Sequence, residues 1–217
     1  MIIFDLDDTL IDTTGSVTPF KFRQCLKHLI EKGSCFIDFE AAYESLLAYN
    51  ALSLKSVEAL SRFISETGID PAQAASVFAE LTGPLPAEFV VATTPGAKEI
   101  LSFFHSAHRL ALVTGGHPLF QLEKLKKAGL DSSVFSKIHI PEDSIKKPYY
   151  QALIKEFSIP PEEIWVCGDR IQMDLVPAHE LGCRTIHMRW GRGLRMETED
   201  WIDHSIATLR ELKGIIK

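Results

Sequence analysis

The chain has 217 residues, of which 46% are hydrophobic and 24% charged, with a formal net charge of -6. This length allows one large domain or a core domain that carries an insertion. The acidic balance and the lack of a dense Lys/Arg run argue against a nucleic-acid-binding protein. No apolar stretch approaches membrane-spanning length, and no secretory signal precedes the first apolar segment. We therefore expect a soluble, cytoplasmic protein.

The four cysteines show neither CxxC spacing nor the spacing of a zinc site; they are Cys25, Cys35, Cys167 and Cys183. We expect them to be reduced thiols that are mostly buried, which agrees with a cytoplasmic location.

The first predicted element is a buried strand at residues 2–5, which runs directly into Asp5-Leu6-Asp7-Asp8-Thr9. Buried carboxylates are costly unless they are paired or bind a metal ion, and ligands of open α/β sheets bind at the carboxyl ends of the strands. Asp5 and Asp7 point to the same side of an extended segment, so one could attack a substrate while the other handles protons or binds metal. An acidic turn after an edge strand is the alternative reading of this segment.

The next 80 or so residues show helical rather than strand periodicity. Apolar residues recur at helical spacing over 22–30, 39–47 and 57–64, with Gly68 closing the third helix. Asp70-Pro71 then reads as the start of a fourth helix over 74–81. Four helices are too many for one crossover, so we predict a helical cap domain at residues 15–91, inserted into a core of residues 1–14 and 92–217. Such a cap could close over the site and exclude water.

Four further strands are predicted at residues 110–114, 137–140, 164–168 and 184–188, with helical segments between them. Short apolar strands that alternate with helices are typical of a parallel sheet covered on both faces. Three polar segments accompany them. Thr114-Gly115-Gly116 and Gly168-Asp169-Arg170, with Asp174 beyond, follow strands, and Lys146-Lys147-Pro148 precedes a helix. Taken alone, each could be a plain turn or a solvated surface.

Taken together, these segments predict one site, because the carboxyl ends of parallel strands meet at one edge of the sheet. Carboxylate oxygens suit Mg²⁺, and a hydroxyl followed by glycines can offer hydrogen-bond donors to a phosphoryl group. A lysine would add a positive charge, and phosphoryl transfer depends mainly on positioning and charge neutralisation. The sequence has no Walker loop, no GxGxxG and no evident Ser-His-Asp set, and we treat its eight histidines as structural or surface residues.

The four motifs, in this order, resemble those of the haloacid dehalogenase (HAD) superfamily. They are DxDxT at Asp5–Thr9, Thr114, Lys147-Pro148, and Gly168-Asp169 with Asp174. The resemblance extends over the core, including Gln121, Lys124-Leu125, Gly129-Leu130, Ala178 and Leu181-Gly182. It implies an α/β fold with a Rossmann-like parallel sheet, and the inserted helices correspond to the superfamily's C1 cap.

The resemblance also implies roles for individual residues. Asp5 would be the nucleophile that forms an aspartyl-phosphate, and Asp7 would protonate the leaving alkoxide and then activate water. The Asp5 carboxylate, the Asp7 backbone carbonyl and Asp169 would hold Mg²⁺, with Asp174 in support. Thr114, the Gly115 backbone N–H and Lys147 would bind the phosphoryl oxygens. Lys146 is the fallback for the lysine, although the Lys-Pro dipeptide favours Lys147.

These assignments favour a Mg²⁺-dependent phosphatase that acts on a small phosphorylated metabolite, as a monomer or small homo-oligomer. Dehalogenases and phosphonate-cleaving relatives lack the second aspartate, and the cap lysines that could serve phosphonate cleavage are expected at the surface: Lys21, Lys27, Lys32 and Lys55. A phosphosugar mutase and a non-catalytic phosphate-binding protein stay open as alternatives. A receiver domain is disfavoured, because its acceptor aspartate ends the third strand. The roles of His117, Arg170 and Arg192 stay open, although a surface ion pair is expected for Arg170.

Overall fold

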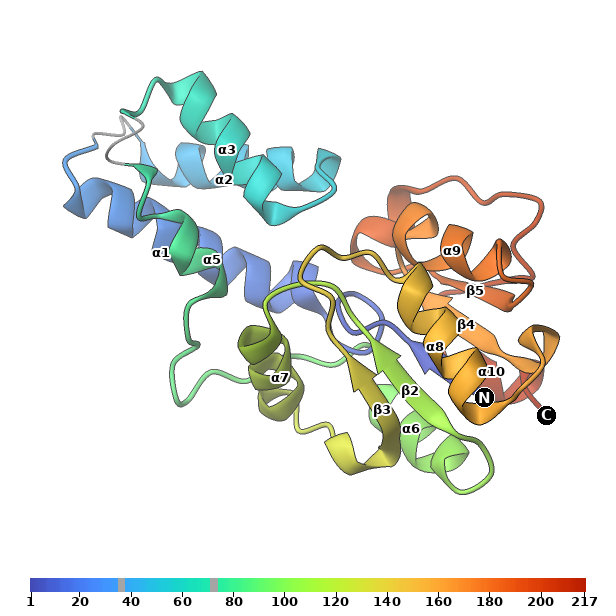
Figure 1. Cartoon of the computed structure of the whole chain (residues 1–217). Coiled ribbons are helices and arrows are strands. Elements are labelled where there is room, and N and C mark those ends of the chain that lie inside the picture. Colours follow the sequence, from blue (N-terminus) through green and yellow to red (C-terminus); the bar gives the residue numbers. More distant parts are fainter. Residues whose placement is uncertain (35–37, 71–73) are drawn as a thin grey trace. The chain divides into compact units, whose positions relative to one another are not determined.

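The computed structural model describes residues 1–34, 38–70 and 74–217, so Cys35 and Pro71 lie outside the described residues. The chain divides into two compact units. Residues 1–14 and 87–217 form the core unit, and residues 15–86 form the helical unit (Figure 1). Within the described ranges, no helix is both long enough and apolar enough to cross a bilayer.

The core unit is built on a six-stranded sheet in the order β3-β2-β1-β4-β5-β6, and every neighbouring pair is parallel. The strands are β1 (Ile2–Phe4), β2 (Leu110–Val113), β3 (Phe135–His139), β4 (Trp165–Gly168), β5 (Arg184–Met188) and β6 (His204–Ile206). The first five follow the predicted strands within a few residues. The sequence pattern missed β6, because only one of its three residues is buried and no apolar run marks it.

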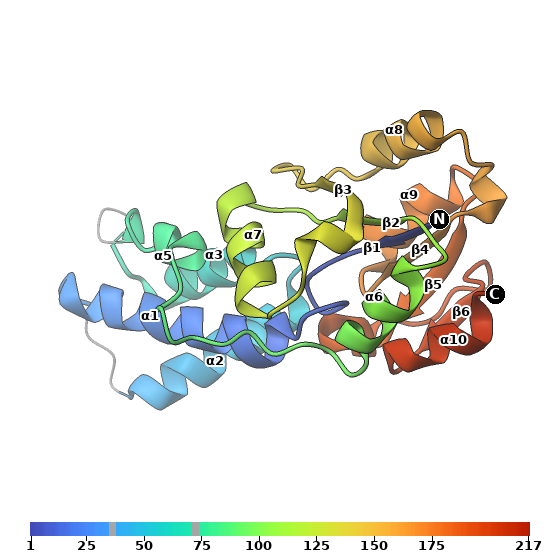
Figure 2. The same cartoon turned by 90° about the horizontal axis from the view of Figure 1, so that it is seen from below.

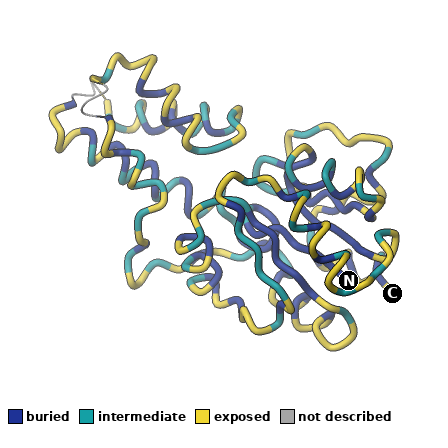
Figure 3. Tube along the Cα trace, in the orientation of Figure 1, coloured by how far each residue is buried: buried dark blue, intermediate teal, exposed yellow. Residues whose placement is uncertain are grey.

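Helices cover both faces of the sheet (Figure 2), which explains why the central strands β1, β2 and β4 are buried along their whole length (Figure 3). On one face, Ile3, Ala111 and Val166 pack in a cluster with side chains of α8 and α9. The helices α6 and α10 lie on the opposite face (Figure 2). The helices of the core unit are α6 (Ala97–His105), α7 (Pro118–Lys127), α8 (Lys147–Phe157), α9 (Val176–His179) and α10 (Leu212–Ile215).

The strand order reverses between β1 and β4, since the chain adds β2 and β3 on one side of β1 and the later strands on the other. Phe4 pairs with Leu112 of β2 and with Cys167 of β4, so these three strands end at nearly the same level. In open α/β sheets, ligands bind outside the carboxyl ends of the strands at such a reversal. The residues that follow β1, β2 and β4 are therefore the expected location of a ligand site.

Two segments of the core unit, one on each side of the helical unit in sequence, pair with each other. Ile11 and Thr93 form an antiparallel bridge. The N–H of Asp12 donates to the Ala92 carbonyl at 2.8 Å, and the N–H of Thr94 donates to the Leu10 carbonyl at 3.1 Å. We call residues 10–12 and 92–94 the paired stems.

The second unit boundary falls between Pro86 and Ala87, earlier than the boundary after residue 91 that the sequence predicted. Val91 is buried, and its N–H donates to the carbonyl of Lys127 at the end of α7. The Lys127 Nζ in turn donates to the Ala87 carbonyl at 3.1 Å. These contacts with a helix distant in the sequence attach residues 87–91 to the core unit, and a short segment between prolines, without periodicity, gives no sign of them.

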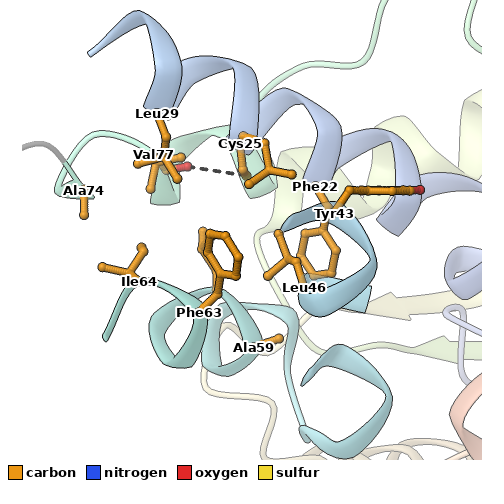
Figure 4. Packing of buried hydrophobic residues seen from close by; sticks show 12 residues of the cluster. Phe22, Cys25, Leu29, Tyr43, Leu46, Ala59, Phe63, Ile64, Ala74 and Val77 are labelled. Carbon is orange, nitrogen blue, oxygen red and sulfur yellow. Dashed lines mark hydrogen bonds between the residues drawn. The ribbon is translucent and has the colours of Figure 1, made fainter. Parts of the chain in front are cut away.

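The helical unit packs its helices around one apolar cluster (Figure 4). Leu29 of α1, Leu46 of α2 and Phe63 of α3 are all buried in it. Gly68 ends α3 in the left-handed conformation, as the sequence predicted. The helices are α1 (Thr18–Glu31), α2 (Phe39–Leu52), α3 (Ser56–Thr67) and α5 (Phe78–Thr82); α5 begins later than the predicted fourth helix, whose start at Pro71 is not described.

Lys21 of α1 is buried rather than at the surface, contrary to the expectation for the cap lysines. Its Nζ donates to the carbonyls of Gly83 and Pro84 at 2.8 and 3.2 Å and to the Gln24 side chain at 3.0 Å. This lysine therefore holds the last residues of the helical unit against α1.

Three cysteines are free thiols in buried positions, namely Cys25, Cys167 and Cys183. Burial raises the pKa of Cys25 to about 12 and that of Cys183 to about 11, so both are protonated at neutral pH.

Candidate active site

Three buried carboxylates gather at the reversal of strand order. Asp5 follows β1, Asp169 follows β4, and Asp174 lies in the turn Ile171–Leu175; each offers an oxygen within 4.8 Å of the other two. The N–H of Asp5 donates to the Cys167 carbonyl at 3.0 Å, which continues the pairing of β1 and β4 up to the site. The sheet itself therefore fixes the separation of the Asp5 and Asp169 backbones.

The turn after β4 brings Asp174 back to the end of its own strand. Its carboxylate accepts a hydrogen bond from the Arg170 N–H at 2.9 Å, and its own N–H donates to the Arg170 carbonyl at 2.7 Å. A Cβ at Gly168 would lie 2.5 Å from the Asp174 side chain. Only glycine at this position leaves room for the carboxylate, which gives a physical reason for the Gly-Asp pair at the end of β4.

The lysine in contact with these carboxylates is Lys146, not Lys147. The buried Lys146 Nζ donates to Asp5 Oδ1 at 2.6 Å and to Asp174 Oδ1 at 2.5 Å. The Lys147 Nζ instead pairs with the exposed Glu180 at 2.7 Å. The structure thus places Lys146, and not the expected Lys147, against these carboxylates: α8 begins at Lys147, and its first turn directs that side chain away from them, whereas Lys146 precedes the helix.

Burial and crowding of like charges dominate the electrostatics of this group. Burial, with the nearby charges of Asp174 and Asp7, raises the pKa of Asp5 to about 7, even though Lys146 acts to lower it. Burial, together with the charges of Asp8, Asp174 and Asp5, raises the pKa of Asp169 well above its ordinary value. Burial alone would lower the pKa of Lys146, but the charges of Asp174 and Asp5 raise it well above the usual value.

Thr114 and Gly115 lie directly after β2, beside the end of β1. The buried Thr114 hydroxyl accepts a hydrogen bond from Gln121 Nε2 at 2.8 Å and keeps its own proton to donate. A Cβ at Gly115 would lie 2.6 Å from the Ser144 hydroxyl oxygen. Glycine therefore allows the loop that carries Lys146 to approach the end of β2.

The Asp7 carboxylate is not one of the three grouped carboxylates. It forms an ion pair with Lys124 and accepts hydrogen bonds from Thr13 and, at 2.9 Å, from Gln121. Burial favours a higher pKa for Asp7, but the charge and hydrogen bond of Lys124 and the other two donors hold the pKa below its usual value. The sequence pattern included Gln121 and Lys124 but gave them no role. Their spacing of three residues on a helix, next to the apolar Phe120 and Leu125, could have indicated that both side chains lie on a buried face.

Two arginines lie at the rim of this acidic group. Arg170 is buried rather than in a surface ion pair, and its Nε has no hydrogen-bond partner among the described residues. Arg192 is half-buried in the turn Gly191–Arg195. Burial and the charge of Arg170 lower the pKa of Arg192, while the charges of Asp8 and Asp169 act to raise it.

These residues fit a small divalent cation. Three buried carboxylates converge, and a single ammonium, that of Lys146, is bonded to two of them. Buried charge of this kind is costly unless it is paired or bound to metal, and oxygen-only ligands are those that Mg²⁺ prefers. Fold and site together define a class: an α/β protein with a buried acidic group, suited to a divalent cation, at the carboxyl edge of a parallel sheet, beside a hydroxyl and a lysine.

The chain belongs to the haloacid dehalogenase-like hydrolases, since the model of that family matches residues 1–182. It is 27% identical to the glyceraldehyde 3-phosphate phosphatase of Pyrococcus furiosus over 100% of this chain and 92% of that protein. It is 28% identical to the protein of the same name from Methanocaldococcus jannaschii, over 100% of this chain and 96% of that protein. Its fold is that of the magnesium-bound HAD hydrolase YfnB from Bacillus subtilis, with a TM-score of 0.71 at 20% identity, covering 100% of this chain and 97% of YfnB.

Proposed function

We propose that this protein is a Mg²⁺-dependent phosphatase that hydrolyses small phosphomonoesters through an aspartyl-phosphate on Asp5. The observation that carries this proposal is the position of Asp5, which lies at the end of β1 against Lys146 and beside two further buried carboxylates. A carboxylate held in this way is suited to attack at phosphorus, and the surrounding positive charge stabilises the transferring phosphoryl group.

In the first half of the reaction, an Asp5 oxygen attacks phosphorus, the bond from phosphorus to the ester oxygen breaks, and the protonated form of Asp7 donates its proton to the departing alkoxide. Because Lys124 and the other donors hold the pKa of Asp7 below its usual value, this form is the minor one in the free protein. In the second half, Asp7 takes a proton from water as that water attacks phosphorus. The bond from phosphorus to Asp5 then breaks, which releases phosphate and restores both aspartates. The Thr114 hydroxyl, the Gly115 N–H and the Lys146 ammonium hold the phosphoryl oxygens, with Lys146 in the role first expected of Lys147.

The Asp5 carboxylate, the Asp7 backbone carbonyl and Asp169 would hold Mg²⁺, and Asp174 would support this set. When bound, the ion neutralises charge on the phosphoryl group. Asp174 is also bonded to Lys146, so its carboxylate connects the cation-binding residues with the lysine.

The substrate class follows from the relatives. Because two of them are named as glyceraldehyde 3-phosphate phosphatases, triose phosphates are the first small phosphorylated metabolites to test. A cytoplasmic location and a monomeric or small homo-oligomeric state, both expected from the sequence, stay predictions.

The test measures phosphate release from a panel of phosphomonoesters, with Mg²⁺ and with EDTA. We expect metal-dependent release by the wild-type protein and none by Asp5→Asn, which removes the nucleophile while keeping a side chain of similar shape. The panel includes triose phosphates, hexose phosphates, phosphoglycolate and nucleoside monophosphates. Release that persists in Asp5→Asn would contradict the aspartyl-phosphate mechanism. Isomerisation of a phosphosugar without phosphate release would indicate a mutase instead.

A further inference from the structure

The side chain of Asp7 is held by buried groups that the proposed mechanism does not use. Lys124 and Gln121 are both 3% exposed, although both are long polar side chains that usually lie at the surface. Lys124 Nζ pairs with Asp7 Oδ1, and Gln121 Nε2 donates to Asp7 Oδ2 at 2.9 Å, so each carboxylate oxygen has its own donor. Both side chains give up their hydration to reach the same carboxylate, whose Oδ1 also accepts a hydrogen bond from the Thr13 hydroxyl.

Gln121 also connects Asp7 with the residues proposed to bind phosphate. Its Nε2 lies 2.8 Å from the Thr114 hydroxyl and 2.6 Å from the Gly115 carbonyl, in addition to Asp7. A flipped amide would turn Oε1 toward the Asp7 carboxylate and the Gly115 carbonyl, which accept hydrogen bonds and cannot donate them. The orientation of the amide is therefore determined by its neighbours.

The helix α7 keeps these two side chains in a fixed relation. Gln121 and Lys124 are three residues apart and so lie on one face of the helix. Phe120 and Leu125, which adjoin them in sequence, are also buried and fix that face of the helix against the core unit. A helix packed in this way holds the two donors in fixed positions, and these donors restrict the Asp7 side chain to one orientation. Without them, the side chain would rotate among several rotamers.

We propose that Lys124 and Gln121 are positioning residues that hold the Asp7 carboxylate beside Thr114, where it serves the leaving group. The inference rests on the proposed function, in which Asp7 donates a proton to the departing alkoxide. Correct placement of an acid or base within hydrogen-bond reach is worth a large part of its catalytic effect. Without Lys124, the Asp7 side chain loses the charged partner that fixes its orientation.

A purely structural ion pair and a positioning role differ in how they depend on the leaving group. An alkoxide needs a proton as it departs, whereas a nitrophenolate is stable enough to leave without one. Loss of Asp7 positioning should therefore slow the release of an alkyl alcohol and have little effect on the release of nitrophenolate. A general loosening of the fold would slow both to a similar extent.

The experiment compares the single-turnover release of alcohol from an alkyl phosphate with that of p-nitrophenolate from p-nitrophenyl phosphate, both with Mg²⁺. The variants are Lys124→Met, Lys124→Arg, Gln121→Leu and Asp7→Asn. Lys126→Met is the matched control, because this neighbour on α7 is exposed. We expect Lys124→Met to slow alcohol release by roughly 10²-fold and nitrophenolate release by less than about 5-fold. Gln121→Leu should give a smaller change with the same selectivity, and Lys124→Arg, which keeps charge and donors, should recover most of the rate.

The double variant Asp7→Asn/Lys124→Met should be no slower in alcohol release than Asp7→Asn alone, since residues that act through one another are not additive. Equal slowing of both esters in Lys124→Met and Gln121→Leu, or unchanged rates in both, would overturn the proposal. If Lys124→Met does not fold, Gln121→Leu tests the same selectivity between the two esters. Wild-type protein that releases neither product would overturn the proposed function itself, which is a different result.

Discussion

Lys146 donates to Asp5 and Asp174 at once, and all three side chains are buried. Removing one partner of a buried ion pair leaves the other charge without compensation, which costs several kcal/mol in typical cases, about 3–5. An exposed pair such as Lys147 with Glu180 contributes about 1 kcal/mol or less. We therefore expect the loss of Lys146 to affect the protein far more than the loss of its neighbour Lys147.

We predict that Lys146→Met lowers kcat for the best phosphomonoester by at least roughly 10²-fold, because the phosphoryl group loses a charged hydrogen-bond donor. Lys147→Met, the matched control, should stay within about 2-fold of wild type. Both rates are measured at saturating substrate and Mg²⁺, after circular dichroism has verified the fold. A large loss in Lys147→Met with an active Lys146→Met would return the role to Lys147.

The sequence identified this pair of lysines, but the Lys-Pro dipeptide favoured Lys147, whereas the structure places Lys146 against the carboxylates. The Lys-Pro dipeptide locates the start of α8 within a residue, and the choice depends on which side chain the first turn directs toward the strands. Asp5 and Asp169 were easier to place, because each follows a buried strand directly. Gln121 and Lys124 were harder to interpret, since their burial depends on a contact with Asp7, more than a hundred residues earlier in the chain.

At the scale of elements, the helical unit depends on its own apolar cluster. Phe63 of α3 is 1% exposed within this cluster, while Leu52 at the end of α2 is 76% exposed. A large aromatic side chain removed from a packed interior leaves a cavity that neighbouring residues fill only in part.

We predict that Phe63→Ala lowers the free energy of unfolding of the helical unit by about 3–5 kcal/mol, and that Leu52→Ala changes it by no more than about 0.5 kcal/mol. Urea titration followed by circular dichroism at 222 nm measures both. Equal effects of the two substitutions would mean that the cluster does not hold this unit together.

Most elements were predictable because their patterns are local. The strands β1, β2, β4 and β5 are apolar runs, and the helices of the helical unit show a clear periodicity. The failures share a physical cause: β6 and residues 87–91 are held by contacts with segments far away in the sequence, namely β5 and the end of α7. β6 has a single apolar residue, and residues 87–91, although mostly apolar, are too few to show a periodicity.

At the scale of the whole molecule, the buried carboxylates couple folding to pH and to metal. Burial raises the pKa of Asp5 from 3.8 to about 7. A carboxyl group whose pKa is higher in the folded state contributes stability at low pH, and this stability is lost as the pH rises through the folded-state value. The metal-free protein should therefore be stabilised by protonation of Asp5 below about pH 7 and lose that stabilisation above it.

We predict that, in EDTA, Asp5→Asn is more stable than wild type at pH 8 by at least about 1 kcal/mol, since one pKa unit corresponds to about 1.4 kcal/mol. The difference should shrink as the pH falls from 8 and should vanish only below the ordinary value of 3.8, where Asp5 is protonated in both folded and unfolded chains. Urea unfolding at a series of pH values measures it. A difference that does not vary between pH 4 and pH 8 would contradict the raised pKa. Excess Mg²⁺ at pH 8 should stabilise wild type more than the variant.

The paired stems have a consequence for how such a protein changes over evolutionary time. Because Ile11 and Thr93 bridge each other and hydrogen bonds join their neighbours, the two ends of the core unit are held together at the point where the helical unit is inserted. The chain between the stems could lengthen, shorten or be exchanged without shifting the register of β1 against β2, and the entropy of closing a longer loop grows only slowly with its length. The segment between the paired stems can therefore be replaced while the site residues of the core unit keep their positions.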